Sequence, residues 1–172
     1  ETLLQGTLTN IESITLDYAV WDDSYNYVQT RDRAFEVETA TVLALVNLGV
    51  NARAYVTFDG AALHAIYADI EAEQVLAQRE ALFERLVTSE EIRELAQSAP
   101  SFATYVVLDG RILAVAGAQI HRSDGSGEAT AFVVSAVEFG DTTASEALQT
   151  PIVVSTETTG LSMLPSRDES RP

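Results

Sequence analysis

The sequence predicts an α+β fold, in which a long N-terminal helix and further helices pack on one side of a single antiparallel sheet. Three observations lead to this prediction. Apolar residues recur every three or four positions from about Leu3 to Gln29, which is the spacing of one helix face. From residue 52 the apolar period changes to two, as in strands. Two Asp-Gly pairs, Asp59-Gly60 and Asp109-Gly110, separate such segments as hairpin turns.

The helical patterns predict three helical regions. At about 1.5 Å per residue, the first helix would be roughly 35 to 40 Å long, and its apolar stripe consists of Leu4, Leu8, Ile11, Ile14, Tyr18, Trp21, Tyr25 and Val28. A second helix is expected from Asp32 or Arg33 to Leu48, with Gly49 as its stop. A helical pattern returns between Asp69 and Ala99 and breaks near Thr88-Ser89, where either hydroxyl can cap the second piece.

The remaining segments predict strands and turns in a single domain. Strands are expected at residues 52–58, 62–68, 103–108, 112–120, 129–139 and 151–155, with a longer turn at 123–127 and a short helix at 143–148. A chain of 172 residues is long enough for one domain with a substantial core. We therefore expect one domain over residues 1–157, followed by a polar tail over 158–172.

Composition excludes several classes of function. The formal net charge is −16, and all ten basic residues are arginine. Nucleic acids and anionic lipid surfaces would repel such a chain, so neither is an expected partner. Because cysteine is absent, disulfides, thiolate nucleophiles and cysteine zinc sites are excluded. No run of about 18 apolar residues predicts a membrane span. Since the sequence starts at Glu1, we expect a domain taken from a larger protein.

No arrangement of residues predicts catalysis. Asp22 and Asp23, in the segment DYAVWDDSYNY, would project about 100° apart on a helix and do not converge on one point. Paired carboxylates of glycosidases lie about 5 to 9.5 Å apart across the sugar, so a hydrolase using these two residues is disfavoured. His64 and His121 fall on predicted strands without metal-ligand spacing. We expect no catalytic residue, no metal and no cofactor.

A ligand pocket is the better candidate for function. Polar and aromatic residues on or beside the predicted strands are Tyr55, His64, Tyr67, Tyr105, Arg111 and Arg122. An arginine beside a sheet-lined cleft can hold a carboxylate through paired hydrogen bonds. In a chain this acidic, Arg111 and Arg122 can equally pair with a surface carboxylate.

Several segments together resemble one known family. They are DYAVWDDSYNYV, ARAYVTFDGAALHAIYA and YVVLDGRILAVAGAQIHRSDGSGEATAFVVSAVEFGD. From about Leu8 to Val154 the chain resembles the fourth-type CHASE domain, an extracytoplasmic sensing domain associated with cyclases and histidine kinases. The family marks are Trp21-Asp22 with Tyr25 on the first helix, and Arg122 before the turn Ser123–Gly127.

This resemblance implies a PAS-like, Cache-related sheet over residues 52–156, mounted on a signalling helix over 1–29. It implies a non-enzymatic sensor on the periplasmic or extracellular side of the cytoplasmic membrane, anchored through flanking segments of a bacterial or archaeal receptor. The output would be a diguanylate cyclase, a phosphodiesterase or a histidine kinase. Candidate ligand-binding residues are Trp21, Asp22, Tyr25, Tyr55, Tyr105, Arg111 and Arg122. The ligand would be an unidentified small molecule.

Two mechanical expectations follow for the first helix. Leu4, Leu8 and Ile11 would pair between the subunits of a homodimer, which would carry the signal. Tyr18, Trp21, Tyr25 and Val28 would instead pack on the sheet, with Trp21-Asp22 as a joint between helix and sheet. The alternative is a protein-interaction module that senses a periplasmic partner protein.

Overall fold

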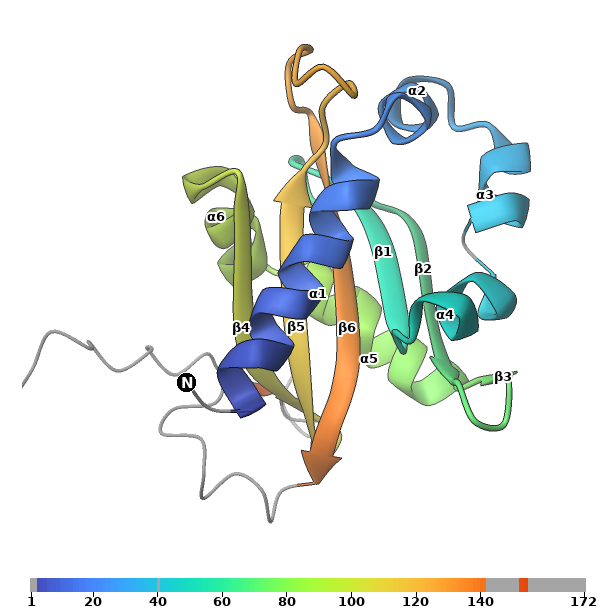
Figure 1. Cartoon of the computed structure of the whole chain (residues 1–172), viewed down its shortest axis with the longest axis vertical. Coiled ribbons are helices and arrows are strands. Elements are labelled where there is room, and N and C mark those ends of the chain that lie inside the picture. Colours follow the sequence, from blue (N-terminus) through green and yellow to red (C-terminus); the bar gives the residue numbers. More distant parts are fainter. Residues whose placement is uncertain (1–2, 40, 142–151, 155–172) are drawn as a thin grey trace, which may run out of the picture.

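The computed structural model describes residues 3–39, 41–141 and 152–154, and a seven-stranded sheet is its centre (Figure 1). The strand order is β3-β2-β1-β6-β5-β4-β7. The strands are β1 (Ala52–Thr57), β2 (Ala62–Asp69), β3 (Gln74–Val75), β4 (Ser101–Leu108), β5 (Arg111–Gln119), β6 (Ala131–Asp141) and β7 (Ile152–Val154). All neighbouring pairs are antiparallel except β4 and β7, which are parallel. The α+β class is therefore confirmed.

Helices cover both faces of this sheet, so the prediction that they all pack on one side is wrong. α1 (Leu3–Ala19) crosses one face, and α5 (Ala77–Val87) and α6 (Glu90–Ser98) lie on the other (Figure 1). The reason is visible in the central strand β6, where every residue from Ala131 to Ala136 is buried. A strand that is apolar on both sides has to be covered on both sides.

The first predicted helix ends at Ala19 and resumes only as α2 (Asp22–Thr30). Between them, Val20 forms a parallel bridge with His121. The Trp21 N–H donates to the His121 carbonyl at 3.1 Å, and the His121 N–H donates to the Ala19 carbonyl at 3.1 Å. Backbone pairing with the end of the sheet thus interrupts the helix, although the apolar spacing continues through it.

The second predicted helix is also divided, into α3 (Arg33–Thr39) and α4 (Val42–Leu48). Thr41 caps α4 by accepting a hydrogen bond from the Ala44 N–H at 3.2 Å. Gly49 ends α4 with φ 71°, as predicted. A short side chain that captures a nearby N–H competes with helix continuation.

The third helical region begins later than predicted. Asp69 accepts hydrogen bonds from the N–H groups of Glu71 and Ala72, which forms a turn, and β3 follows before α5 starts at Ala77. The predicted break at Thr88-Ser89 is confirmed. Ser89 caps α6 by accepting from the Ile92 N–H at 3.3 Å.

The predicted strands are confirmed with boundaries shifted by at most two residues. The last strand, expected at 151–155, is β7 (Ile152–Val154). The expected short helix at 143–148 and the polar tail at 158–172 lie outside the described residues.

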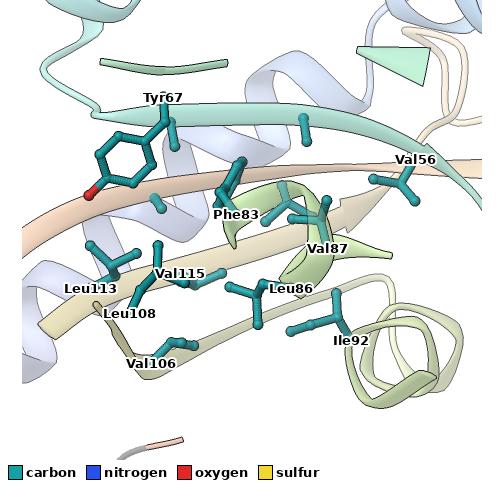
Figure 2. Packing of buried hydrophobic residues seen from close by; sticks show 14 of the residues in the cluster. Val56, Tyr67, Phe83, Leu86, Val87, Ile92, Val106, Leu108, Leu113 and Val115 are labelled. Atoms are coloured by element: carbon teal, nitrogen blue, oxygen red, sulfur yellow. The ribbon is translucent and has the colours of Figure 1, made fainter. Parts of the chain in front are cut away.

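Two apolar layers hold the helices to the sheet. Figure 2 shows the layer under α5 and α6, where Phe83, Leu86 and Ile92 pack on strand residues such as Val106 and Val115. The layer under α1 contains Ile11, Ile66, Ala114 and Ala116, with Leu8 at its margin. Ile11 is only 1% exposed.

The α1 layer corrects the expected dimer contact. Ile11 is buried against its own sheet, so it is not available for the expected contact between subunits, whereas Leu8 is only partly buried beside it. The side chain of Leu4, the third residue of that expectation, lies outside the described residues.

Candidate functional site

The two motifs that carried the resemblance contact each other, although they lie 101 residues apart in sequence. The Ser123 N–H donates to Asp22 Oδ1 at 2.8 Å, and the Asp22 N–H donates to Ser123 Oγ at 3.0 Å. Together with the Val20–His121 bridge, these bonds attach the start of α2 to the loop after β5. We call residues 19–25 and 121–127 the helix–loop joint.

The rest of the motif residues pack within this joint. The guanidinium of Arg122 lies 4.5 Å from the centre of the Tyr25 ring, a cation–π contact. Gly127 lies under the same ring, where an added Cβ would be 2.6 Å from the nearest ring atom. His121 Nδ1 lies 2.9 Å from the Gly127 carbonyl, and Asp124 accepts from the Ser126 N–H. The hydrogen bonds from Ser126 also hold the pKa of Asp124 below its usual range.

An aromatic cluster adjoins the joint, formed by Tyr18, Trp21, Tyr27, Phe35 and Tyr55. Tyr27 and Phe35 stack at 4.6 Å between ring centres, and both meet Tyr55 edge-on at 5.3 and 5.5 Å. Trp21 links this group to Tyr18, with ring centres 5.8 Å from Phe35 and 5.7 Å from Tyr18. The end of α1, α2 and α3 thus contribute rings over β1.

Two phenols of this cluster, those of Tyr27 and Tyr55, have pKa values raised above the ordinary value. Burial raises the pKa of Tyr55, whose hydroxyl lies 3.2 Å from Ser24 Oγ. Burial and a hydrogen bond to Glu36 raise the pKa of Tyr27. Neither tyrosine therefore supplies a negative charge to the interior.

Beneath the cluster lies Arg53, a charged side chain that is only 1% exposed. None of its three guanidinium nitrogens has a hydrogen-bond partner in the described part of the chain. The Tyr18 ring lies 3.9 Å from Arg53 Cζ and covers it. Arginine remains charged inside proteins, and an uncompensated buried charge is expensive. This guanidinium is therefore the least satisfied polar group among the described residues.

Ser135 faces the same space from the neighbouring strand. It pairs directly with Arg53 between β1 and β6, and directly paired residues of antiparallel strands share a face. Ser135 is fully buried, and its hydroxyl also lacks a partner within the described residues. Two adjacent buried hydrogen-bonding groups without partners mark a place that can receive a polar group from outside the chain.

The sequence-predicted site residues fall into three places. Trp21, Asp22, Tyr25 and Arg122 meet at the helix–loop joint, and Tyr55 lies in the aromatic cluster. Tyr105 lies on β4, three strand spacings or about 14 Å from β1. Arg111 lies at the start of β5, where it pairs with Glu138 at 3.2 Å. The seven residues therefore do not form one site.

The two other candidate strand residues, His64 and Tyr67, lie on opposite faces of the sheet. His64 pairs with Tyr55 across β1 and β2 and is half-buried. Tyr67 lies in the opposite apolar layer, where its hydroxyl donates to Glu138 Oε1 at 2.7 Å.

Sequence reasoning missed Arg53, Ser135 and Ser24. In the strand ARAYVTF, alternation places Arg53 and Tyr55 opposite to Ala52 and Ala54, and the polar side of an alternating strand normally faces water. Here that side is covered by α1 and the aromatic cluster. The signal that could have found Arg53 is a basic residue between two alanines in a strand whose neighbours are apolar on both faces.

Two hollows lie along the N-terminal helices. A pocket of about 280 Å³ lies between α1 and the turn before β1, and it is lined by Gly6, Thr7, Asn10, Ile11, Ile14, Gly49, Val50 and Val137. Another, of about 270 Å³, lies between α2 and α3 and includes the carboxylates of Asp23, Asp32 and Glu38. In the described part of the chain, no group of three or more potential metal ligands gathers. Among the same residues, no helix is long and apolar enough to span a membrane.

A family model for the CHASE4 domain matches residues 3–150. The chain belongs to the CHASE4 family. The CHASE4 model covers both halves of the helix–loop joint, the aromatic cluster and Arg53. This CHASE4 domain is an extracytoplasmic sensor domain of a signalling protein, as the resemblance implied.

One solved structure supports the fold of this CHASE4 domain. The extracellular domain of the candidate histidine kinase vpHK1S-Z8 superposes with a TM-score of 0.55 at 14% sequence identity. The alignment covers 85% of this chain and 56% of that structure, so the chain spans little more than half of its neighbour. A search of curated proteins finds no match.

Proposed function

We propose that this CHASE4 domain binds a small molecule on the extracytoplasmic side of a membrane-anchored signal-transduction protein. The observation that supports it is the pair of buried, unpartnered groups of Arg53 and Ser135 under α1 and the aromatic cluster. Native proteins leave few such groups unsatisfied, and binding sites are among the places where they occur. The output domain would be a diguanylate cyclase, a phosphodiesterase or a histidine kinase.

The proposed signal leaves through α1. Tyr18, in the last turn of α1, covers Arg53, so a ligand at Arg53 would compete with a contact that positions the helix. A ligand changes a conformational equilibrium only by its difference in affinity for the two states. Displacement of the guanidinium from the Tyr18 ring provides such a difference.

The proposed homodimer needs a revised contact. Since Ile11 and Leu8 face the domain's own core, pairing through α1 would use its outward, polar residues such as Asn10 and Ser13. Sedimentation of the domain with and without ligand tests this, and a strict monomer in both conditions contradicts it.

The domain itself is proposed to be non-catalytic. Asp22, the first of the two carboxylates considered for hydrolysis, accepts the Ser123 N–H and is committed to the joint. Asp23 lies one residue away in the same helix and borders the pocket between α2 and α3.

One observation favours the alternative, a module that senses a partner protein. Val37 on α3 and Leu43 on α4 are exposed by 66% and 64%, and α3 also borders the acidic pocket. Exposed apolar residues beside acidic ones suit a basic, partly apolar protein surface.

A thermal-shift screen of small acids, amines and sugars distinguishes the two functions. A ligand at a hundredfold excess over Kd should raise the unfolding temperature by about 5 to 10 °C. Small-molecule sensing predicts such a shift, and a Val37→Ser, Leu43→Ser double variant should retain it. Loss of partner capture in that double variant, with no small molecule active, would instead support protein sensing.

A further inference from the structure

The chemistry around Arg53 narrows the class of ligand. A guanidinium offers five N–H donors in a planar fork that matches the two oxygens of a carboxylate. All three nitrogens of Arg53 lack acceptors in the described residues, and the neighbouring Ser135 hydroxyl can donate a further bond. The aromatic ring of Tyr18 satisfies one face of the guanidinium but leaves the in-plane N–H groups without acceptors.

No described acidic side chain reaches this guanidinium. The two ion pairs found in the described part of the chain both use Glu138, which bonds to Arg79 and Arg111. The hydroxyl that Tyr55 places on the same face of β1 is a neutral phenol bonded to Ser24. The missing negative charge therefore has to come from outside the described chain.

The pocket between α1 and the turn before β1 is lined by near neighbours of the residues that flank Arg53, although Arg53, Ser135 and Tyr18 are not among its lining residues. Its lining residue Val137 follows Ser135 by two positions on β6, so both face the same side about 7 Å apart. Its lining residue Ile14 lies one helical turn before Tyr18 on α1. The lining residues are thus one strand step from Ser135 and one helical turn from Tyr18, the two residues that flank Arg53.

The lining of that pocket indicates the body of the ligand. Ile11, Ile14, Val50 and Val137 supply aliphatic walls, and no basic residue is among the lining residues. Its volume of about 280 Å³ suits a molecule of few carbon atoms. A second carboxylate would therefore find no cation there.

We infer that the domain binds a short aliphatic monocarboxylate, with its carboxylate on Arg53 and Ser135 and its alkyl chain in the pocket beside α1. This inference rests on the proposed small-molecule function and names the class of ligand for the same site. Binding would give acceptors to the guanidinium N–H groups at the edge that faces the carboxylate, and a movement of the guanidinium toward the carboxylate would weaken its contact with the Tyr18 ring.

The test is titration of the 172-residue chain with acetate, propionate, butyrate and valerate, each compared with its neutral amide and with inorganic phosphate. Each added methylene should tighten binding about fourfold until the pocket is full. The amides should bind at least about tenfold more weakly, because they lose the charge-assisted bonds. Phosphate should bind no better than the amides.

Variants test whether the carboxylate binds at Arg53. Arg53→Met should lower carboxylate affinity at least about 100-fold, whereas Arg111→Met, which removes a half-exposed arginine from another edge, should leave it unchanged. Ser135→Ala should have a smaller effect. Removing an uncompensated buried charge should not lower the unfolding temperature of the free protein.

Wild-type measurements keep the inference testable even if Arg53→Met does not fold. Carboxylates, but not amides, should shift the guanidinium Nε–H resonance of Arg53 and leave that of Arg122 in place. Arg53→Lys keeps the charge but loses the planar fork, and it should bind at least about tenfold more weakly.

Three results would overturn the inference. They are equal binding of acids and amides, a carboxylate response that Arg53→Met retains, and binding of phosphate but not of carboxylates. If amines or sugars bind while carboxylates do not, only the ligand class is wrong and the proposed function stands. If no small molecule binds, the inferred ligand class and the proposed function are both wrong.

Discussion

At the scale of single residues, two adjacent aspartates have different structural roles. Asp22 and Asp23 both lie in the first turn of α2, where the helix dipole favours a negative charge equally for each. Only Asp22 also accepts the Ser123 N–H, at 2.8 Å. Asp23 therefore serves as an internal control for Asp22.

We predict that Asp22→Ala lowers the free energy of unfolding by about 1 kcal/mol more than Asp23→Ala does. The loss of charge at the helix start cancels in this comparison, and the bond to Ser123 remains as the difference. Urea unfolding followed by circular dichroism measures both variants. Equal effects would show that the joint contributes nothing to stability.

Gly127 and Gly125 offer a second matched pair in the same loop. Both have positive φ, 92° and 83°, so an alanine is strained at each. An added Cβ at Gly127 would also meet the Tyr25 ring, whereas nothing lies within 4 Å at Gly125. The contact with Tyr25 is thus the difference between the two positions.

Gly127→Ala should therefore destabilise the domain by about 1 to 3 kcal/mol more than Gly125→Ala, because the Tyr25 ring and the stacked Arg122 have to move. Chemical denaturation gives the two free energies. A loop that accommodates both alanines alike would contradict the close packing of Gly127 on Tyr25.

Residues of the joint were predictable from sequence, whereas the buried arginine was not. Trp21-Asp22 and the turn 123–127 are distinctive because short polar motifs capture backbone groups locally. Arg53 looks like any exposed strand residue, since its burial depends on helices contributed by other parts of the chain. Its lack of a partner depends on where every other carboxylate lies, and periodicity does not carry that information.

At the scale of elements, caps decided which predicted boundaries were right. Gly49 ends α4 through its own backbone conformation, and Ser89 caps the start of α6 through its hydroxyl. Both of these helix boundaries appear where predicted. The break at Val20 arises from pairing with His121, a residue far away in sequence. Apolar spacing predicted which face of the first helix is buried, but it carries no information on backbone pairing with a distant residue and therefore did not predict this interruption.

Ser89→Ala should lower the free energy of unfolding by about 1 kcal/mol, because the Ile92 N–H at the start of α6 loses its acceptor. Thr88→Ala is the control, since the Thr88 hydroxyl bonds back to the Glu84 carbonyl of α5 and caps no helix start. We expect the free energy of unfolding of Thr88→Ala to stay within about 0.5 kcal/mol of the wild-type value. Thermal unfolding of both variants checks the prediction, and equal losses would argue against capping by Ser89.

At the scale of the whole molecule, the absence of lysine and the burial of tyrosines together determine how stability changes with pH in the alkaline range. Burial, and then Glu138, raise the pKa of Tyr67, and burial raises the pKa of Tyr55. A group whose pKa is raised by folding contributes stability that is full below its unfolded pKa, about 10 for tyrosine, and is lost as the pH rises above it. No lysine titrates in the same range.

The free energy of unfolding should therefore fall above about pH 10, by about 1.4 kcal/mol per pH unit for each buried tyrosine that remains neutral. Tyr67→Phe removes one such group, and it should reduce this slope by about that amount. Urea titrations between about pH 8 and 11 measure the slope. An unchanged slope in Tyr67→Phe would show that Tyr67 ionises as easily in the folded protein as in the unfolded one.

The Val20–His121 bridge has a mechanical consequence for α1. Directional backbone bonds attach the helix to the sheet at its C-terminal end, while along its length the described contacts with the sheet are mainly apolar packing. Apolar packing is non-directional and resists small rotations weakly. The N-terminal end of α1 lies away from this attachment, where the helix crosses β4 (Figure 1). If α1 turned about this attachment, a small shift at Tyr18 would become a larger displacement at the N-terminal end of the helix.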